Sequence, residues 1–393
     1  MSKHIIFCAD GTWNGPGAQP EDDIDGGTQA DTEVHDEVTN VVKLFANLAG
    51  QVTAETQALH NEAEKVLKSA PDTPAQVAKY MHGVGDSRNP IIKALGGVLG
   101  AGVIGRIVRG YTFISRNYDP GDSIHIVGFS RGAYTARALA GMIASVGLLN
   151  RAHYDPTDKS ESYLRAIAAW MKCKGIVFTG DDRLSSWLNR AASFAQRLIV
   201  RVTLKPADFV TGVRIASVGV WDTVGSMGIP NYIHGERRDL FSFVDLKLSP
   251  LIEHGFHAMA LDERRADFPV TRWAADPRVE EAWFVGAHSD VGGGYAASES
   301  TLSDVALDWM TSKLAGAGVR FASPPTYEPD RNLRATDFHK PWKKPPFNLN
   351  PQAREPSAAN DVFHPSVAEF WKANPSYQTL WPGGFARAAG QPK

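Results

Sequence analysis

Residues 123–132 read SIHIVGFSRG, and this stretch decides the fold class. Its first half is apolar, as in a buried strand, and Gly132 opens a run rich in small residues that predicts a helix through Val146. The pentapeptide Gly128-Phe129-Ser130-Arg131-Gly132 therefore lies where a strand turns into a helix. Gly-x-Ser-x-Gly is weak evidence by itself, but at this position it predicts the sharp elbow that presents a nucleophilic serine above a sheet.

Short apolar runs alternate with helical patterns along the chain, which indicates a mostly parallel central sheet flanked by helices. The predicted strands are His4 to Cys8, Val77 to Met81, Ser123 to Phe129, Val213 to Trp221 and Glu281 to Val285. The predicted helices are Thr39 to Leu48 with Thr39 as the cap, Gly132 to Val146, and Ile252 to Phe268. The fold class is α/β, resembling an α/β-hydrolase with an inserted helical cap.

We expect residues 1–393 to form a single α/β-hydrolase domain. Residues 15–37 are rich in Asp, Glu and Gly and predict a mobile acidic loop. Residues 150–207 separate two strands by more than a crossover needs and predict an inserted cap or lid. Residues 323–393, rich in proline, predict an irregular C-terminal tail packed on the body.

The cap contains a stretch, residues 182–205, with two distinct helical stripes. One stripe is apolar, and the other carries Arg183, Arg190, Arg197 and Arg201. A structural helix packed on the body and an interfacial lid over the site both fit this pattern.

Composition sets further bounds on the protein. Its 393 residues are 43% hydrophobic with a formal net charge of −2, so a large core can form and no overall basic field exists to hold nucleic acid. Only two cysteines occur, which fits synthesis in a reducing compartment. We expect neither a signal peptide nor a transmembrane helix, and therefore a cytoplasmic protein as synthesised. Any membrane contact would be peripheral.

A serine hydroxyl needs a base and an orienting acid to act as a nucleophile. In α/β-hydrolases the acid and then the histidine follow the serine along the chain. Asp222 ends the apolar run before it, and His288 lies just beyond the next short apolar run. Because parallel strands end at one edge of the sheet, Ser130, Asp222 and His288 should converge there. They are the predicted catalytic residues.

Other residues compete for these roles. His364 is the best alternative base, and Asp262, on what reads as a charged helix face, is the alternative acid. His125 lies within the serine strand and is better explained as structural. His254 and His257 fall in a helical pattern and could be core or surface.

The oxyanion hole should use the backbone amide after the nucleophile, that of Arg131, and a second amide from an early loop. Gly11 or Thr12, directly after the first predicted strand, would supply the second amide. Asp10 could accept from turn amides or belong to a metal site. Asp290 could support the histidine from two residues away.

The sequence resembles the uncharacterised α/β-hydrolase domain of the type VI secretion lipase effectors of family one. The blocks that carry the resemblance are Ile5 to Asn14, Thr39 to Leu44, Tyr80 to Gly85, Gly128 to Arg137, Trp221 to Gly225, His257 to Phe268, His288 to Tyr295 and His364 to Val367. The resemblance implies a Ser-Asp-His hydrolase at Ser130, Asp222 and His288. It also implies an ester or phospholipid substrate, export by a dedicated secretion system, and a secretion-system or immunity partner.

The sequence thus predicts a serine esterase or lipase that acts through an acyl-enzyme and needs no cofactor. Two other classes stay open. In one, a metal-dependent hydrolase uses Asp10, Asp222, His288 and Asp290, because carboxylates and imidazole also bind divalent ions. In the other, the fold is a non-catalytic binding module.

Overall fold

The computed structural model describes most of the chain. The described residues are 2–11, 37–57, 62–71, 73–83, 90–174, 202–224, 232–233, 236–237, 246–266, 268–333, 337–344, 351–357 and 361–381, with backbone alone over 90–102, 232–233 and 236–237. The predicted acidic loop, up to residue 36, and the predicted lid stretch, up to residue 201, lie outside them.

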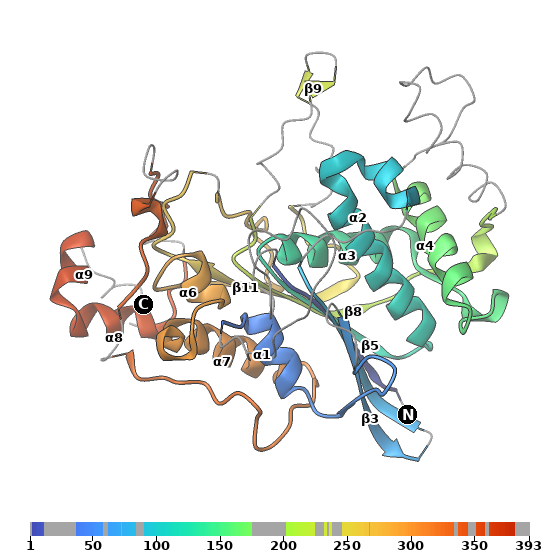
Figure 1. Ribbon diagram of the computed structural model, residues 1–393, viewed down its shortest axis with the longest axis horizontal. Helices are drawn as coiled ribbons and strands as arrows, with labels where there is room; N and C mark the ends of the chain where they lie inside the picture. The colour runs from blue at the N-terminus through green and yellow to red at the C-terminus, as the bar shows by residue number, and fades with distance from the viewer. Residues whose placement is uncertain are drawn as a thin grey trace, which may run out of the picture.

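A central eight-stranded sheet organises the molecule (Figure 1). Its strands, in spatial order, are β12 (Val279–Phe284), β11 (Ile252–Ala260), β8 (Ile215–Trp221), β5 (Ser123–Phe129), β1 (His4–Ala9), β4 (Thr73–Met81), β3 (Glu62–Ala70) and β2 (Gln51–Val52). The first six pair in parallel, and β3 and β2 add antiparallel pairs at one edge. The predicted mostly parallel sheet is confirmed.

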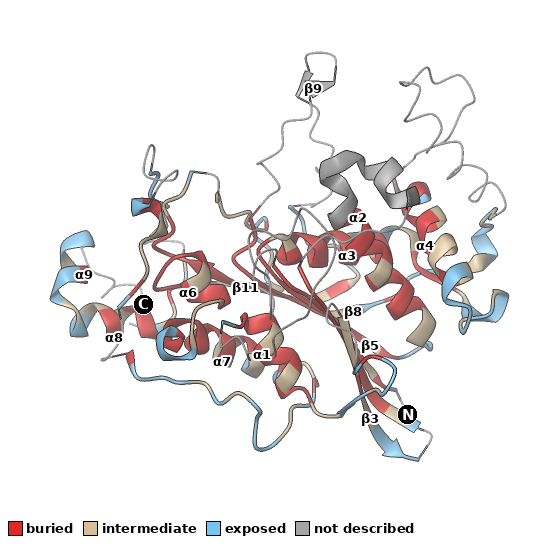
Figure 2. Ribbon diagram, viewed as in Figure 1, coloured by how far each residue is buried: buried red, intermediate tan, exposed pale blue. Residues whose placement is uncertain are grey.

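Strand β1 shows how the sheet separates two cores. Ile5 and Phe7 face one core, while the alternate residues Ile6 and Cys8 face the other, and all four are fully buried. Such two-sided burial is typical of a parallel sheet covered on both faces. Figure 2 shows the buried strands enclosed between two layers of helices.

Different helices cover the two faces. The Ile5 face is covered by α2 (Pro90–Asn117), α3 (Arg131–Val146) and α4 (Lys159–Cys173). The Ile6 face is covered by α1 (Asn40–Asn47), α6 (His288–Gly292), α7 (Thr301–Gly316) and α8 (Pro365–Ala373), with α9 (Pro375–Leu380) beyond them (Figure 1). Outside this sandwich, β6 (Leu148–Leu149) pairs with β7 (Phe209–Val210), and β9 (Tyr232–Ile233) pairs with β10 (Glu236–Arg237).

The five predicted strands and two of the three predicted helices are confirmed, with ends shifted by at most a few residues. Thr39 caps α1 as expected, since its side chain accepts a hydrogen bond from the Val42 amide. The prediction of a helix over Ile252 to Phe268 was wrong. Residues 252–260 form strand β11, which pairs in parallel with β8 on one side and β12 on the other.

The described parts of the predicted cap, 150–207, and of the predicted C-terminal tail, 323–393, contain regular structure. Helix α4, within the predicted cap, buries Ala166, Ile167 and Trp170 in the same core as α2 and α3. The C-terminal stretch is not irregular throughout, since it forms α8 and α9 and buries Phe370 and Tyr377 in the opposite core.

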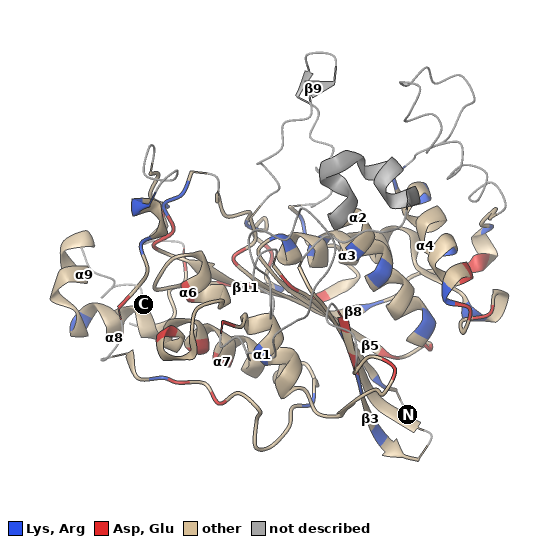
Figure 3. Ribbon diagram, in the orientation of Figure 1, with Lys and Arg blue, Asp and Glu red and all other residues tan. Residues whose placement is uncertain are grey.

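The described surface mixes charges of both signs. Figure 3 shows acidic and basic residues together along α4 and β3. Within the described residues, none of the helices has the length and apolar character needed to span a bilayer.

The sheet register brings four strand ends together. Phe129 at the end of β5 pairs with Trp221 at the end of β8, so Ser130 and Asp222 leave neighbouring strands at the same level. Trp221 in turn pairs with Ala258 of β11, and Ala260 pairs with Phe284, the last residue of β12. The loops after these strands therefore meet at one edge of the sheet.

Candidate active site

Ser130 occupies a strained turn between β5 and α3. Its backbone has φ 57° and ψ −123°, which an L-residue rarely adopts. The turn is held by the Ser130 amide, which donates to the carbonyl oxygen of Trp221 on the neighbouring strand at 3.1 Å. Ser130 is 7% exposed. A sharp strand-to-helix turn of this kind is the elbow that the sequence predicts.

The two glycines of the pentapeptide are required by close backbone approach. A Cβ added at Gly128 would lie 2.3 Å from the carbonyl oxygen of Gly132. A Cβ added at Gly132 would lie 2.1 Å from the carbonyl oxygen of Ala9 on β1. The glycines therefore allow α3 to begin directly against the ends of β5 and β1.

Asp222 follows β8 and is fully buried, also with a positive φ of 38°. Its Oδ2 lies 2.6 Å from Nδ1 of His288, and its Oδ1 accepts the Ala260 amide at 2.9 Å. The predicted acid and base are thus in direct contact.

His288 is the first residue of α6, and aromatic rings fix its orientation. Its ring centroid lies 4.6 Å from that of Phe129, the residue before Ser130, and 5.0 Å from that of Phe268, which meets it edge-on. Its backbone amide donates to Glu263 Oε2 at 3.1 Å. With Nδ1 on Asp222, the other nitrogen, Nε2, is buried and has no hydrogen-bond partner among the described residues. Nε2 is the nitrogen available for proton transfer.

A residue that the sequence did not indicate, Arg354, also binds Asp222. Its Nη1 donates to Asp222 Oδ1 at 2.6 Å and its Nη2 to Oδ2 at 3.0 Å. Burial alone would raise the pKa of Asp222, but the Arg354 charge and the contacts with His288 hold it well below its usual range.

Asp10 lies beside the elbow and binds neighbouring donors. Its carboxylate accepts from the Gly11 amide at 2.6 Å, from the Thr39 hydroxyl at 2.9 Å and from the Tyr80 hydroxyl at 2.7 Å. Burial raises its pKa to about 7, although these hydrogen bonds oppose the rise. This pattern matches the turn-binding role rather than the metal role considered for Asp10.

The predicted oxyanion donors have different surroundings. Arg131 is the first residue of α3, so its amide directly follows the nucleophile. Gly11 lies against Ser130, since a Cβ added there would be 3.4 Å from the Ser130 Cβ. Its amide, however, donates to Asp10 and is not free for an oxyanion in this conformation. Thr12 lies outside the described residues.

Asp290 contacts the start of α6, the helix that begins at His288, and its support of the histidine stays a prediction. Its Oδ2 accepts the Ala287 amide at 2.8 Å, just before His288. His339, a second partner that the sequence did not indicate, places Nδ1 2.6 Å from Asp290 Oδ1. Asp10, Asp222 and Asp290 thus have separate partners, and no group of three or more His, Cys, Asp or Glu within the described residues is arranged to hold a metal ion.

Residues 3–313 match the family model of the Tle1-like phospholipase effectors of the type VI secretion system, catalytic domain. The chain belongs to this family. Ser130, Asp222 and His288 lie within the Tle1-like match, whereas His339 and Arg354 lie beyond it.

The similar proteins are distant. The uncharacterized protein YEL023C of Saccharomyces cerevisiae is 27% identical over 279 residues, which are 68% of this chain and 32% of that protein. The structure of an uncharacterized protein from Pseudomonas aeruginosa has 18% identity and a TM-score of 0.40, over 81% of this chain and 46% of the other. The structure of the Tle1 effector bound to the VgrG spike has 21% identity and a TM-score of 0.36, over 77% and 53%. This Tle1-like chain thus spans about a third of the curated relative and about half of each solved structure.

The alternative base and acid have other partners. His364 caps α8 by accepting the Ser366 amide, and its ring stacks on Phe284. Burial lowers its pKa to about 4. Asp262 is not on an exposed helix face as expected, since it is 1% exposed and accepts from the Gly286 amide and the Tyr377 hydroxyl.

The remaining candidate histidines lie in the sheet. His125 contacts the Ser217 hydroxyl and stacks on His4, as a structural residue would. His254 and His257 belong to β11 instead of a helix, and His257 accepts the Thr223 amide beside Asp222.

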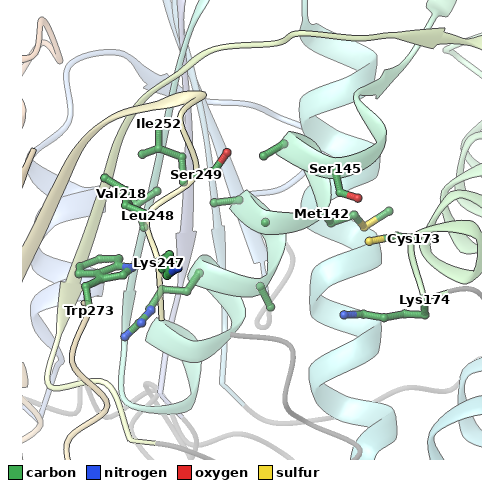
Figure 4. Close-up of a pocket in the computed structure, with 15 residues that line it drawn as sticks. Met142, Ser145, Cys173, Lys174, Val218, Lys247, Leu248, Ser249, Ile252 and Trp273 are labelled. Atoms are coloured by element: carbon green, nitrogen blue, oxygen red, sulfur yellow. The ribbon is translucent and has the colours of Figure 1, made fainter. Parts of the chain in front are cut away.

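Two cavities bear on where a substrate could enter. One of about 370 Å³ lies between α3, the end of α4 and residues 247–252, and Figure 4 shows Met142, Lys174 and Trp273 around it. None of the three predicted catalytic residues lines it. A second cavity, of about 290 Å³, is lined by Phe268 and Arg354 and adjoins the Asp222 side of the site.

Proposed function

We propose that this chain is a serine hydrolase that cleaves carboxylic esters of lipids, phospholipids among them. The observation that carries the proposal is the 2.6 Å contact between Asp222 and His288 beside a serine on a strained elbow. Membership of a phospholipase effector family supports a lipid ester as the substrate.

The proposed chemistry is acyl transfer in two steps. Ser130 Oγ attacks the ester carbonyl carbon while His288 Nε2 takes its proton, and the same imidazolium then protonates the departing alcohol. Water attacks the acyl-enzyme by the reverse route, releasing the fatty acid and restoring the serine. Asp222 holds the imidazole in the tautomer with a proton on Nδ1 and stabilises the imidazolium.

Developing negative charge on the carbonyl oxygen needs preorganised donors. The Arg131 amide at the start of α3 would be one, aided by the partial positive charge of a helix N-terminus. For the second donor we propose Thr12 over Gly11, because Asp10 already accepts the Gly11 amide.

The family description also motivates a proposal on delivery. We propose that a type VI secretion system exports the protein and that its spike or an immunity protein is its partner. Loss of the protein from the medium when the secretion machinery is deleted would support this, and unchanged export would reject it.

Substitution of Ser130 tests whether it is the nucleophile. Ser130→Ala should lower turnover of a p-nitrophenyl ester at least roughly a thousandfold, since only binding and oxyanion contacts remain. A fluorophosphonate should label the wild-type protein at Ser130, located by peptide mass spectrometry. Turnover should not respond to a chelator, which a metal-dependent hydrolase would.

Matched variants make this test specific. Ser160→Ala, at an exposed position in the first turn of α4, should keep wild-type turnover. His288→Ala should resemble Ser130→Ala, while His364→Ala should stay active. An inactive His364→Ala beside an active, folded His288→Ala would show that the base is assigned wrongly.

A further inference from the structure

The guanidinium of Arg354 is built into the site through four contacts. Two go to the Asp222 carboxylate, one to each oxygen. The others go to backbone carbonyl oxygens, that of Ala260 at 2.6 Å and that of Phe268 at 2.8 Å. The Arg354 side chain is 8% exposed, so these contacts are shielded from water. A planar guanidinium that meets both carboxylate oxygens fixes orientation as well as charge.

The backbone around Arg354 is attached to the loop that follows β11, which also carries Phe268. The Gln352 amide donates to the Arg264 carbonyl oxygen at 2.7 Å, and Pro351 forms an isolated bridge with Arg265. Arg354 therefore joins residues 351–354 to the end of β8 and to the loop that carries Phe268. Phe268 meets the His288 ring edge-on. Arg354 therefore holds both Asp222, the hydrogen-bond partner of the imidazole, and Phe268, which packs against it.

Two other buried carboxylates show what Arg354 changes. Asp10 and Asp262 are as buried as Asp222, and their side-chain hydrogen bonds come from uncharged donors. Burial raises their pKa values, to about 7 for Asp10 and about 6 for Asp262. The pKa of Asp222 is lowered instead, because Arg354 and His288 outweigh its burial.

We propose that Arg354 is the positioning residue of the candidate triad, holding Asp222 ionised and aimed at His288 Nδ1, an inference that rests on the proposed function. It lies 132 residues from Asp222 along the chain and beyond the matched catalytic domain. The segment after residue 313 is therefore part of the catalytic machinery and not only a cover for the body.

Several charged groups surround this pair and enter its titration. His288 and Arg354 contact Asp222 directly. Glu263 accepts the His288 amide, and Glu281 contacts His257, which accepts the amide after Asp222. Removing the Arg354 cation makes protonation of Asp222 more favourable, because that cation lowers the pKa of the carboxylate. The acidic limb of the pH–rate profile must then move to higher pH.

The test compares Arg354→Ala and Arg354→Lys with the wild type on a soluble p-nitrophenyl ester. For Arg354→Ala we expect kcat to fall roughly a hundredfold, as for a misplacement of about 1 Å, with little change in KM. Its acidic limb should move to higher pH, and added guanidinium should restore part of kcat. Arg354→Lys should lose kcat but keep the limb, because a lysine retains the charge without the two-pronged geometry.

The control is Arg331→Ala, which removes an exposed arginine–aspartate pair with Asp308 from the same C-terminal region. It should leave kcat and the pH profile unchanged. The proposal is overturned if folded Arg354→Ala keeps wild-type kcat, or if its kcat falls with neither a limb shift nor guanidinium rescue, which would mark a structural role. If Arg354→Ala does not fold, wild-type kcat in Arg354→Lys overturns the proposal. Wild-type protein without Ser130-dependent hydrolysis would overturn the proposed function as well.

Discussion

Ser130 and Asp222 share a backbone property that bears on the proposed site. Among the described residues, they are the two non-glycine residues with positive φ. Each such conformation costs on the order of 1–3 kcal/mol and persists only where the surroundings enforce it. Here the enforcing contacts are the Ser130 amide on Trp221 and the paired carboxylate of Asp222. Strain at these two positions, on neighbouring strand ends, supports the proposal that they act together.

Asp222→Asn should strongly reduce turnover and also lower the melting temperature, because the shielded Arg354 cation loses its carboxylate partner. An amide at this position favours the wrong imidazole tautomer, which removes a large part of kcat in serine hydrolases. The loss should be smaller than that of Ser130→Ala, because the orienting acid contributes less than the nucleophile. Steady-state kinetics on a soluble ester, with thermal melts to verify folding, would measure this.

Asp262→Asn is the matched control for that change. Asp262 is also buried but binds Tyr377 and Trp381 instead of the imidazole. It should alter the melting temperature more than turnover. Equal turnover losses in the two variants would argue against Asp222 as the specific partner of His288.

Residue patterns predicted the three candidate catalytic positions because each follows an apolar run that ends at the same sheet edge. The same patterns could not predict Arg354, since nothing local in residues 351–355 marks a contact 132 residues away. The sequence also could not predict that the Gly11 amide is occupied, because its hydrogen bond to the Asp10 carboxylate depends on how that side chain is oriented. Long-range contacts of single polar groups leave no periodic signal.

At the scale of elements, β11 shows where periodicity misleads. Its last six residues, Gly255 to Ala260, are all buried, so no alternation of polar and apolar residues is visible. Both faces of an interior parallel strand are covered, and such a run cannot be told from a buried helix by pattern alone. Strand β3, which lies between β4 and the edge strand β2, was missed for the opposite reason, because four charged residues leave it without an apolar run.

The contact of His339 with Asp290 gives a pH-dependent prediction for α6. The pKa of His339 is raised, chiefly by its hydrogen bond to the Asp290 carboxylate and further by Glu299. A raised folded-state pKa stabilises the protein below the ordinary histidine pKa, and this stabilisation is lost as pH rises through the folded value. His339→Ala should therefore lower the melting temperature more near pH 6 than near pH 9.

His153→Ala provides the comparison for His339→Ala. His153 also contacts an aspartate, Asp208, but its side chain is 40% exposed and far from α6 in sequence. It should shift the melting temperature less at either pH. A His339→Ala effect that is the same at both pH values would show that packing on Tyr295, not charge, dominates.

At the scale of the whole molecule, the C-terminal stretch is part of the core on the Ile6 face. Phe363, Val367 and Phe370 are almost fully buried there together with residues of α1 and α7. The sequence predicted a tail packed on the body but not its helices, since prolines and tryptophans suggested irregular backbone. In the structure, prolines begin α8 and α9, where the missing amide hydrogen has no cost.

Phe370→Ala should therefore destabilise the whole fold, not a separate tail. Phe370 is 1% exposed, and its ring meets those of Tyr377 and Phe338 edge-on. Emptying such a site typically costs about 3–5 kcal/mol of unfolding free energy, through lost burial and the cavity left behind. Chemical denaturation, followed by tryptophan fluorescence and by circular dichroism, should show one transition shifted to lower denaturant in both signals.

Val362→Ala, at a position 61% exposed, should change little. A Phe370→Ala effect no larger than that of Val362→Ala, or two separate transitions, would mean that α8 is not part of the cooperative fold.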